Sequence, residues 1–290
     1  MEALTDDKKE FLIDKANLIR QSIIESLVEA GSGHTAGPLG MSDIFTALYF
    51  HIMHHDPQKP AWPERDRLVL SNGHICPVLY ATMAHAGYFP LAELSTLRKF
   101  GTRLQGHPHR EYLPALETSS GPLGAGLSQA VGMALADRLD FGEAGTSRYI
   151  YALLSDGEFG EGNTWEAFML GAKYKLHNLI AIIDRNNIQI DGYTEEVLPL
   201  EPLADKLASF NWHVIEIDGH NFDDIVGAVG EAQAVYGKPT VIIAHTIPGK
   251  GVAQFERKYE WHGKPPTKAE GQAALAELRT LAGKIKSEHE

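Results

Sequence analysis

Two polar clusters follow short apolar segments, at places where their side chains could bind a metal ion. The segment Tyr149–Leu154 runs into Asp156, and the segment Leu179–Asp184 runs into Asn186. If the two segments are neighbouring strands of a parallel sheet, their carboxyl ends meet at one edge and bring these side chains together. A carboxylate and an amide oxygen are hard ligands, which suit Mg²⁺ or Ca²⁺.

A site with only two protein side chains is expected to hold a diphosphate, because magnesium usually completes its coordination with water and phosphate oxygens. Gly157 lacks a Cβ and lets phosphates approach the backbone. A helix predicted to begin near Glu161 would present its positive end there. The pairs Asp156-Gly157 and Asn186-Asn187 are also common in turns. Their separation of thirty residues, typical of one βαβ unit, favours the metal site but leaves the turn interpretation open.

Histidine is the second chemical signal in the chain. There are 14 histidines, and several lie beside glycine in irregular segments: His34, His74, His107 and His262. A lone histidine is more often a surface or hydrogen-bonded structural residue. We give that interpretation to His54, His55, His109, His177 and His213.

A zinc site is the natural alternative for a chain this rich in histidine. His51, His54 and His55 have a spacing that could bind a metal from one helix face. No cysteine lies nearby, however, and the adjoining Asp56-Pro57 is typical of a loop. We therefore do not favour zinc at this position.

The elements that must position these residues follow from the apolar pattern. Short apolar segments alternate with amphipathic ones, which indicates an α/β fold with a mainly parallel sheet flanked by helices. Strands are predicted at 67–70, 149–154, 179–184, 212–217 and 240–244. Helices are predicted at 7–30, 42–54, 74–87, 125–139, 161–174, 202–209, 222–236 and 269–290. With no linker between them, residues 1–290 are expected to form one domain with an N-terminal helical region and a C-terminal helix.

Composition excludes several classes of function. The net charge of −12 argues against nucleic-acid binding and against docking on anionic membranes. Cys76 is the single cysteine, so no intrachain disulfide can form. The first ten residues lack the apolar core of a signal peptide, and the apolar runs are too short to span a bilayer. We expect a cytoplasmic protein.

Several motifs together resemble the transketolase family. They are Ser32–Asp43 (SGHTAGPLGMSD), Leu68–His74 (LVLSNGH), Gly106-His107-Pro108 and Glu117–Gly126 (ETSSGPLGAG), with Trp261-His262-Gly263 near the end. Ser155-Asp156-Gly157 followed by Asn186-Asn187 resembles the metal–diphosphate motif of thiamine diphosphate enzymes. The chain departs from the family at Ser155, where glycine is usual, and at Thr35-Ala36, where Pro-Gly is usual.

The resemblance implies a thiamine diphosphate cofactor and Mg²⁺, with Ca²⁺ as an alternative ion. The implied metal ligands are Asp156, Asn186 and the carbonyl of Ile188. The implied cofactor contacts are His34, His74, Gly121, Pro122, Leu123, Gly124, Gly157, Glu158, Glu161 and His262, in addition to those ligands. Glu161 resembles a carboxylate that links two active sites across a dimer. The implied catalytic residues, which contact sugar oxygens and transfer protons, are His34, His107 and His262.

The implied reaction moves a two-carbon ketol unit from a ketose phosphate to an aldose. In the family, the glutamate and aromatic residue at the cofactor's pyrimidine ring come from a second domain. We expect a separate C-terminal subunit to carry the pyrimidine-binding and C-terminal domains, in an assembly of two copies of each subunit. The alternatives are an α subunit of a 2-oxo acid dehydrogenase, a transketolase for an unusual phosphorylated or sulfonated sugar, and a non-catalytic scaffold subunit.

Overall fold

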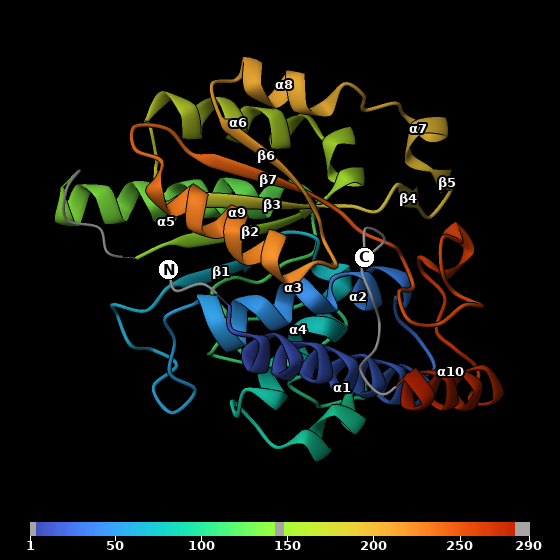
Figure 1. Cartoon of the computed structure of the whole chain (residues 1–290). Coiled ribbons are helices and arrows are strands. Elements are labelled where there is room, and N and C mark those ends of the chain that lie inside the picture. The colour runs from blue at the N-terminus through green and yellow to red at the C-terminus, as the bar shows by residue number, and fades with distance from the viewer. Residues whose placement is uncertain (1–3, 143–147, 282–290) are drawn as a thin grey trace.

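A computed structural model describes residues 4–142 and 148–281, and it contains a parallel sheet between two layers of helices (Figure 1). The strand order is β1-β2-β3-β7-β6, and every neighbouring pair is parallel. The bounds are β1 (Arg67–Leu70), β2 (Ile150–Ser155), β3 (Leu179–Arg185), β6 (His213–Asp218) and β7 (Thr240–His245). The predicted α/β class with a mainly parallel sheet is therefore confirmed.

Alternate residues of the central strands enter two separate cores. Tyr151 and Leu153 of β2 join the core that is also formed by α1 (Asp6–Ala30), α3 (Ser42–Ala47), α4 (Cys76–His85) and α9 (Phe222–Ala234). Ile150 and Ala152 join the opposite core with α5 (Ala125–Phe141), α6 (Gly162–Lys173) and α8 (Leu203–Ser209). Because side chains alternate across a strand, this double covering requires the continuous apolar runs seen in the sequence.

Local signals set the ends of the long helices. Thr5 caps α1 by accepting from the backbone N–H of Lys8 at 3.3 Å, and Gly31 ends it with a φ of 62°. The last helix, α10 (Lys268–Leu281), lies along α1, where Asn17 donates to the carbonyl of Leu278 at 3.1 Å. The predicted helix over 269–290 is confirmed as far as 281, and its remainder lies outside the described residues. Within the described ranges, no helix has the length and apolar character needed to cross a membrane.

Three predicted helices differ in their bounds. The helix predicted from 42 to 54 leaves α geometry after Ala47 and continues as a π turn, η1 (Leu48–Ile52), before the chain turns into Asp56-Pro57. The helix predicted from 74 is preceded by a 3₁₀ turn, η2 (Gly73–Ile75). The helix predicted from 161 begins at Gly162, after the 3₁₀ turn η4 (Asp156–Gly160).

Several short elements carry too few residues for a periodic signal. They are α2 (Ala36–Gly40), η3 (Leu91–Thr96), β4 (Ile188–Gln189), β5 (Gly192–Tyr193), α7 (Thr194–Val197) and η5 (Tyr259–Trp261). The strands β4 and β5 form a small antiparallel ribbon directly after Asn186. This ribbon lies beside the strand end that carries the predicted metal ligands.

Candidate active site

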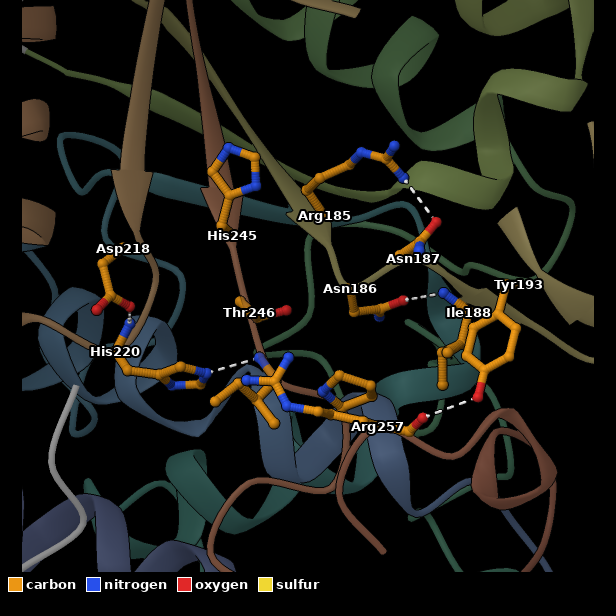
Figure 2. Close-up of a pocket in the computed structure, with 12 residues that line it drawn as sticks. Arg185, Asn186, Asn187, Ile188, Tyr193, Asp218, His220, His245, Thr246 and Arg257 are labelled. Carbon is orange, nitrogen blue, oxygen red and sulfur yellow. Dashed lines mark hydrogen bonds between the residues drawn. The ribbon is translucent and has the colours of Figure 1, made fainter. Parts of the chain in front are cut away.

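The ends of β2 and β3 lie side by side. Ser155 pairs with Asp184 in the parallel register, so Asp156 and Asn186 follow at the same edge of the sheet. Two cavities lie at this edge. One has a volume of about 330 Å³ and includes Asn186 in its lining (Figure 2), and the other has a volume of about 440 Å³ and is lined by histidines. Ile188 lines both, so the predicted ligands stand between the two cavities.

Asp156 is completely buried, and its two carboxylate oxygens have different surroundings. Oδ2 accepts from Arg185 at 2.9 Å, from the backbone N–H of Asn187 at 2.7 Å and from Thr194 at 3.3 Å. Oδ1 has no hydrogen-bond partner among the described residues. Burial raises the pKa of Asp156, and Arg185 opposes that rise by favouring the ionised form. A buried carboxylate oxygen without a partner is costly, and a cation is the group that would satisfy it.

Asn186 is held by the residues on either side of it. Its Nδ2 donates to Oδ2 of Asp184 at 2.7 Å, and its Oδ1 accepts from the backbone N–H of Ile188 at 3.0 Å (Figure 2). Asp184 is also bonded to Thr246, and burial raises the pKa of Asp184 to about 7. Sequence reasoning missed Asp184, because a carboxylate at the end of an apolar strand carries no sign of its partner. Its effect is to fix which way the Asn186 amide faces.

Arg185 was expected only as part of a polar cluster, yet its buried guanidinium joins several segments around Asp156. Nη2 donates to Glu195 at 2.5 Å and to Glu201 at 2.9 Å, while Nη1 bonds Asp156. Only about 6% of its side chain is exposed. Such a charge must be paired inside the protein. Helix α7 and the segment that carries Glu201 are thereby tied to the predicted metal ligand Asp156.

Four histidines from four separate segments converge on the larger cavity. The ring centroids of His34 and His74 are 4.9 Å apart, those of His74 and His262 are 5.1 Å apart, and those of His34 and His262 are 5.6 Å apart. His107 lines the same cavity, together with Gly121, Leu123, Gly157 and Ile188. The chain thus brings most of the predicted cofactor contacts to one place.

Crowding keeps these histidines neutral. Burial, reinforced for His34 by the neighbouring His262, His107 and Arg98, lowers the pKa of His34 to about 4. Burial likewise lowers the pKa of His262 to about 4, and it lowers that of His107. In the described part of the chain, the Nδ1 atoms of His34 and His262 are buried without a partner. A neutral imidazole can donate from one nitrogen and accept at the other, so both rings are available to bind hydroxyl groups.

The replacement of Pro-Gly by Thr35-Ala36 leaves His34 facing the cavity. The hydroxyl of Thr35 donates to the carbonyl of Lys264 at 2.6 Å. This bond joins the segment that carries His34 to the one that carries His262. The departure from the family pattern therefore supplies a new link between two cavity walls.

Glu158 is fully buried, and its carboxylate is occupied by protein donors. One oxygen accepts from Ser71 at 2.5 Å and from the N–H of Gly124 at 2.7 Å, and the other accepts from the N–H of Ser155 at 2.8 Å. Ser155 and Glu158 form a capping box on η4, and the S-x-x-E spacing was a readable signal for it. The cofactor contact predicted for Glu158 stays a prediction, and the visible role is to hold the Gly121–Gly124 loop.

Three other predicted residues have clear positions. Gly124 has a φ of 77°, and a Cβ there would overlap Oδ1 of Asn163, so only glycine fits. A Cβ on Gly157 would meet only ordinary contacts with Gln189, so the fold itself does not require that glycine. Glu161 is exposed just before α6 and makes no side-chain cap bond.

Of the histidines considered for zinc, His55 has a clear structural role. One ring nitrogen of His55 is hydrogen-bonded to the carbonyl of Tyr49 at 2.7 Å, and the other is hydrogen-bonded to the hydroxyl of Tyr88 at 2.9 Å. The structural interpretation of His55 is therefore confirmed. Across residues 4–142 and 148–281, no group of three or more His, Cys, Asp or Glu side chains is placed to hold a metal. The candidate set at the sheet edge differs because it combines one carboxylate with an amide and a carbonyl.

Comparison with known families agrees with this geometry. Residues 13–283 match the family described as transketolase, thiamine diphosphate binding domain. The chain belongs to the transketolase family. Members of this family are transferases, and the thiamine diphosphate predicted from the motifs is the ligand for which the matched domain is named.

Relatives of similar length are transketolase subunits. The chain is 47% identical over 264 residues to the 6-deoxy-6-sulfo-D-fructose transketolase subunit SqwG of a Clostridium species, covering 91% of this chain and 94% of the relative. It is 41% identical to one subunit of the apulose-4-phosphate transketolase of Phocaeicola vulgatus, with 93% and 94% covered. Against human transketolase it is 39% identical, but it spans only 42% of that protein.

The solved structures place the fold in the same family. Campylobacter jejuni transketolase has a TM-score of 0.86 at 34% identity, covering 94% of this chain and 42% of that one. Leishmania mexicana transketolase has a TM-score of 0.85 at 30% identity, covering 98% and 45%. The chain thus corresponds to the thiamine diphosphate binding part of a full-length transketolase.

The first prediction concerns Glu158. Replacing Glu158 with glutamine turns one acceptor oxygen into a donor that faces backbone N–H groups. We expect the free energy of unfolding, measured by denaturant titration, to fall by about 1–3 kcal/mol. The control is Glu166→Gln, a change at an exposed position of α6, which should alter stability by less than about 0.5 kcal/mol. Equal stability of the two variants would contradict this account.

The second prediction concerns how the stability of the fold depends on pH. Histidine in an unfolded chain has a pKa near 6.5, whereas His34 and His262 titrate at about 4 in the folded chain. The unfolded state therefore binds more protons on these two residues between these values, so their contribution to stability is largest above about pH 6.5 and falls as the pH is lowered toward 4. His262→Asn should reduce the slope of this decline in pH-dependent unfolding, and His245→Asn, at an exposed position, should not. An unchanged slope in His262→Asn would show that its pKa is not lowered.

Proposed function

We propose that this chain is the diphosphate-binding subunit of a split transketolase and that residues 1–290 form its single domain. It holds thiamine diphosphate through Mg²⁺ and supplies the histidines that contact the sugar. The observation that carries the proposal is the unpartnered Oδ1 of buried Asp156, which follows the strand end next to that of Asn186 and stands between Ser155 and Gly157 of the histidine cavity's lining. A carboxylate placed in this way asks for a cation, and a cation there can anchor a diphosphate next to the reacting sugar.

The residues at the sheet edge fit this cofactor. Asp156 offers one free oxygen, and the amide oxygen of Asn186 keeps a second lone pair besides its bond from Ile188. The carbonyl of Ile188 completes a set of hard oxygen ligands, which suits Mg²⁺ and would accept Ca²⁺. The remaining coordination positions are left for water and phosphate oxygens. The metal set therefore comprises Asp156, Asn186 and Ile188.

Thiamine diphosphate, when bound, supplies the carbanion chemistry that breaks and forms the carbon–carbon bond. The chain supplies orientation and proton transfer. His34 and His262, neutral and with unpartnered Nδ1 atoms, bind sugar hydroxyls and move protons between them. His107 donates to the donor ketose, and His74 contacts the diphosphate side of the cavity. Gly121, Pro122, Leu123 and Gly124 form the wall that faces the cofactor rings.

A partner subunit completes the site. Among the described residues, the lining of the histidine cavity includes one carboxylate, Asp191 of the exposed ribbon, which supports a partner that supplies the activating glutamate. An exposed apolar side chain lies at this cavity: Ile190, which belongs to its lining, is 66% exposed. Exposed apolar surface of this kind marks an interface. We propose a cytoplasmic assembly of two copies of each subunit, in which Glu161 faces the second copy.

The substrate is proposed to be an anionic ketose. The relatives that the chain spans almost completely are named for a sulfonated and a phosphorylated sugar. With 47% identity to the former, an unusual sulfonated or phosphorylated ketose is favoured over the ordinary sugar phosphates. A 2-oxo acid dehydrogenase subunit is not supported, because the family match is to transketolase.

The third prediction tests the metal ligand. Asp156→Ala should weaken Mg²⁺-dependent binding of thiamine diphosphate, measured by calorimetry on the assembled complex, by at least about a hundredfold. Asp156→Asn keeps the size of the side chain and should show the same loss while staying folded by circular dichroism. Asp205→Ala, at an exposed position of α8, is the matched control and should bind normally. Unchanged affinity in Asp156→Asn would remove the metal assignment.

The fourth prediction tests the partner. The purified chain with Mg²⁺ and thiamine diphosphate should transfer ketol units at less than about 1% of the rate of the complex, because general acid–base groups contribute about a hundredfold or more each. Co-purification identifies the partner, and sulfonated and phosphorylated ketoses are then compared as donors. Ketol transfer by the chain alone at the rate of the complex would refute the split-subunit proposal.

A further inference from the structure

A buried ionic cluster lies between the helical layer and the sheet, and one of its members, His220, also lines the cavity of about 330 Å³ that includes Asn186 (Figure 2). Arg20 of α1 donates from both terminal nitrogens to the carboxylate of Asp43 in α3, at 2.9 and 2.5 Å. The same carboxylate bonds Nδ1 of His220, which follows β6, at 2.7 Å. The side chains of Arg20, Asp43 and His220 are 1%, 6% and 2% exposed. A buried ion pair is poor evidence for stability, because the cost of desolvating the charges offsets their attraction. We therefore looked for a positional role of these three residues in their hydrogen bonds.

The second ring nitrogen of His220 shows which segment this cluster holds in place. Nε2 accepts from the backbone N–H of Ile247 at 2.7 Å (Figure 2). A backbone N–H can only donate, so Nε2 carries no proton and the ring proton is on Nδ1, facing Asp43. Burial lowers the pKa of His220, with Arg20 and Lys250 acting in the same direction and Asp43 against it. The ring is thus a neutral connector between a fixed carboxylate and a loop.

Ile247 lies on the wall of the cavity that contains Asn186 and Ile188. Thr246, just before it, bonds Asp184, which also holds the amide of Asn186. Asp184 therefore holds both Thr246, next to Ile247 in the cavity wall, and the proposed metal ligand Asn186. The wall also lies tightly on α2, because a Cβ on Gly40 would be 3.0 Å from the carbonyl oxygen of Ile247. A shift of Ile247 would narrow or open the cavity beside the proposed metal ligands Asn186 and Ile188.

We propose that His220 is a positioning residue, which holds the backbone of Ile247 in the wall of the cavity beside Asn186 and Ile188, while Asp43 and Arg20 hold His220. The effect on cofactor binding rests on the proposed function, whereas the hydrogen bonds from Arg20 through Asp43 and His220 to Ile247 do not depend on it. Asp43 and Arg20, on the first helices of the chain, thereby reach the cofactor site through one imidazole.

Two substitutions separate the two bonds of His220. His220→Asn places an amide nitrogen near the former Nδ1, so it keeps the bond to Asp43 and loses the acceptor for Ile247. His220→Gln places an amide oxygen near the former Nε2, so it keeps the acceptor for Ile247 and loses the donor to Asp43. Both variants remove one buried hydrogen bond, and both should lower the melting temperature by similar amounts.

The assembled complex is titrated with thiamine diphosphate at saturating Mg²⁺. We expect His220→Asn to raise the dissociation constant about tenfold, which corresponds to one hydrogen bond of about 1.4 kcal/mol, and His220→Gln to stay within about threefold of the natural chain. Equal losses in the two variants, or the reverse order, would overturn the proposal, since a purely structural role does not distinguish them.

Hydrogen exchange supplies a readout that does not depend on the cofactor. The amide of Ile247 should exchange faster in His220→Asn than in the natural chain, and His220→Gln should retain its protection. Equal protection in both variants would overturn the relay. A natural complex that binds no thiamine diphosphate would instead overturn the proposed function, and the exchange of Ile247 would still decide whether His220 holds the wall.

Discussion

The site depends on a carboxylate that the protein satisfies on one side only. Arg185, Asn187 and Thr194 surround Oδ2 of Asp156, whereas Oδ1 is buried and, within the described residues, unpaired. Three donors on one oxygen fix the orientation of the group, so the free oxygen is held in one direction. A fold rarely leaves a buried acceptor without a donor, because the desolvation is not recovered. In the proposed function, a bound cation would satisfy this oxygen, and Arg185, Asn187 and Thr194 keep it directed to one side.

A second layer of buried polar groups makes this arrangement rigid. Asp184 holds the amide of Asn186, Glu158 holds the N–H of Gly124, and His220 holds the N–H of Ile247. Each anchor comes from a different strand end or the loop that follows it, and each acts on backbone or amide groups that border the cavities. Buried groups of this kind position reacting residues more tightly than loops could alone. The cofactor site is therefore carried by the sheet edge, even though irregular segments form its walls.

Sequence pattern predicted the strands well because their burial on both faces leaves continuous apolar runs, as in Leu179–Asp184. The parallel topology predicted that Asp156 and Asn186 lie at the same edge of the sheet. The convergence of the histidines was predicted only from the resemblance to the transketolase family. Asp184, Arg185 and His220 were not recognised, since a polar residue gives no sequence signal of the partner it meets across the fold. The π turn after Ala47 and the ribbon at Ile188 were missed because such short elements depend on tertiary contacts rather than on periodicity.

The clustering of neutral histidines is itself informative about how the site is completed. Within the described residues, the lining of the histidine cavity includes four imidazoles and a single carboxylate, at Asp191. The pKa values of His34 and His262 are lowered because both rings are buried, where the charged form lacks its hydration, and His262, His107 and Arg98 add to this effect for His34. A carboxylate brought close by the partner would oppose that effect and favour the protonated ring. Assembly would then raise the pKa of the nearest histidine toward neutrality, so closing the cavity and preparing its proton-transfer groups would be one event rather than two.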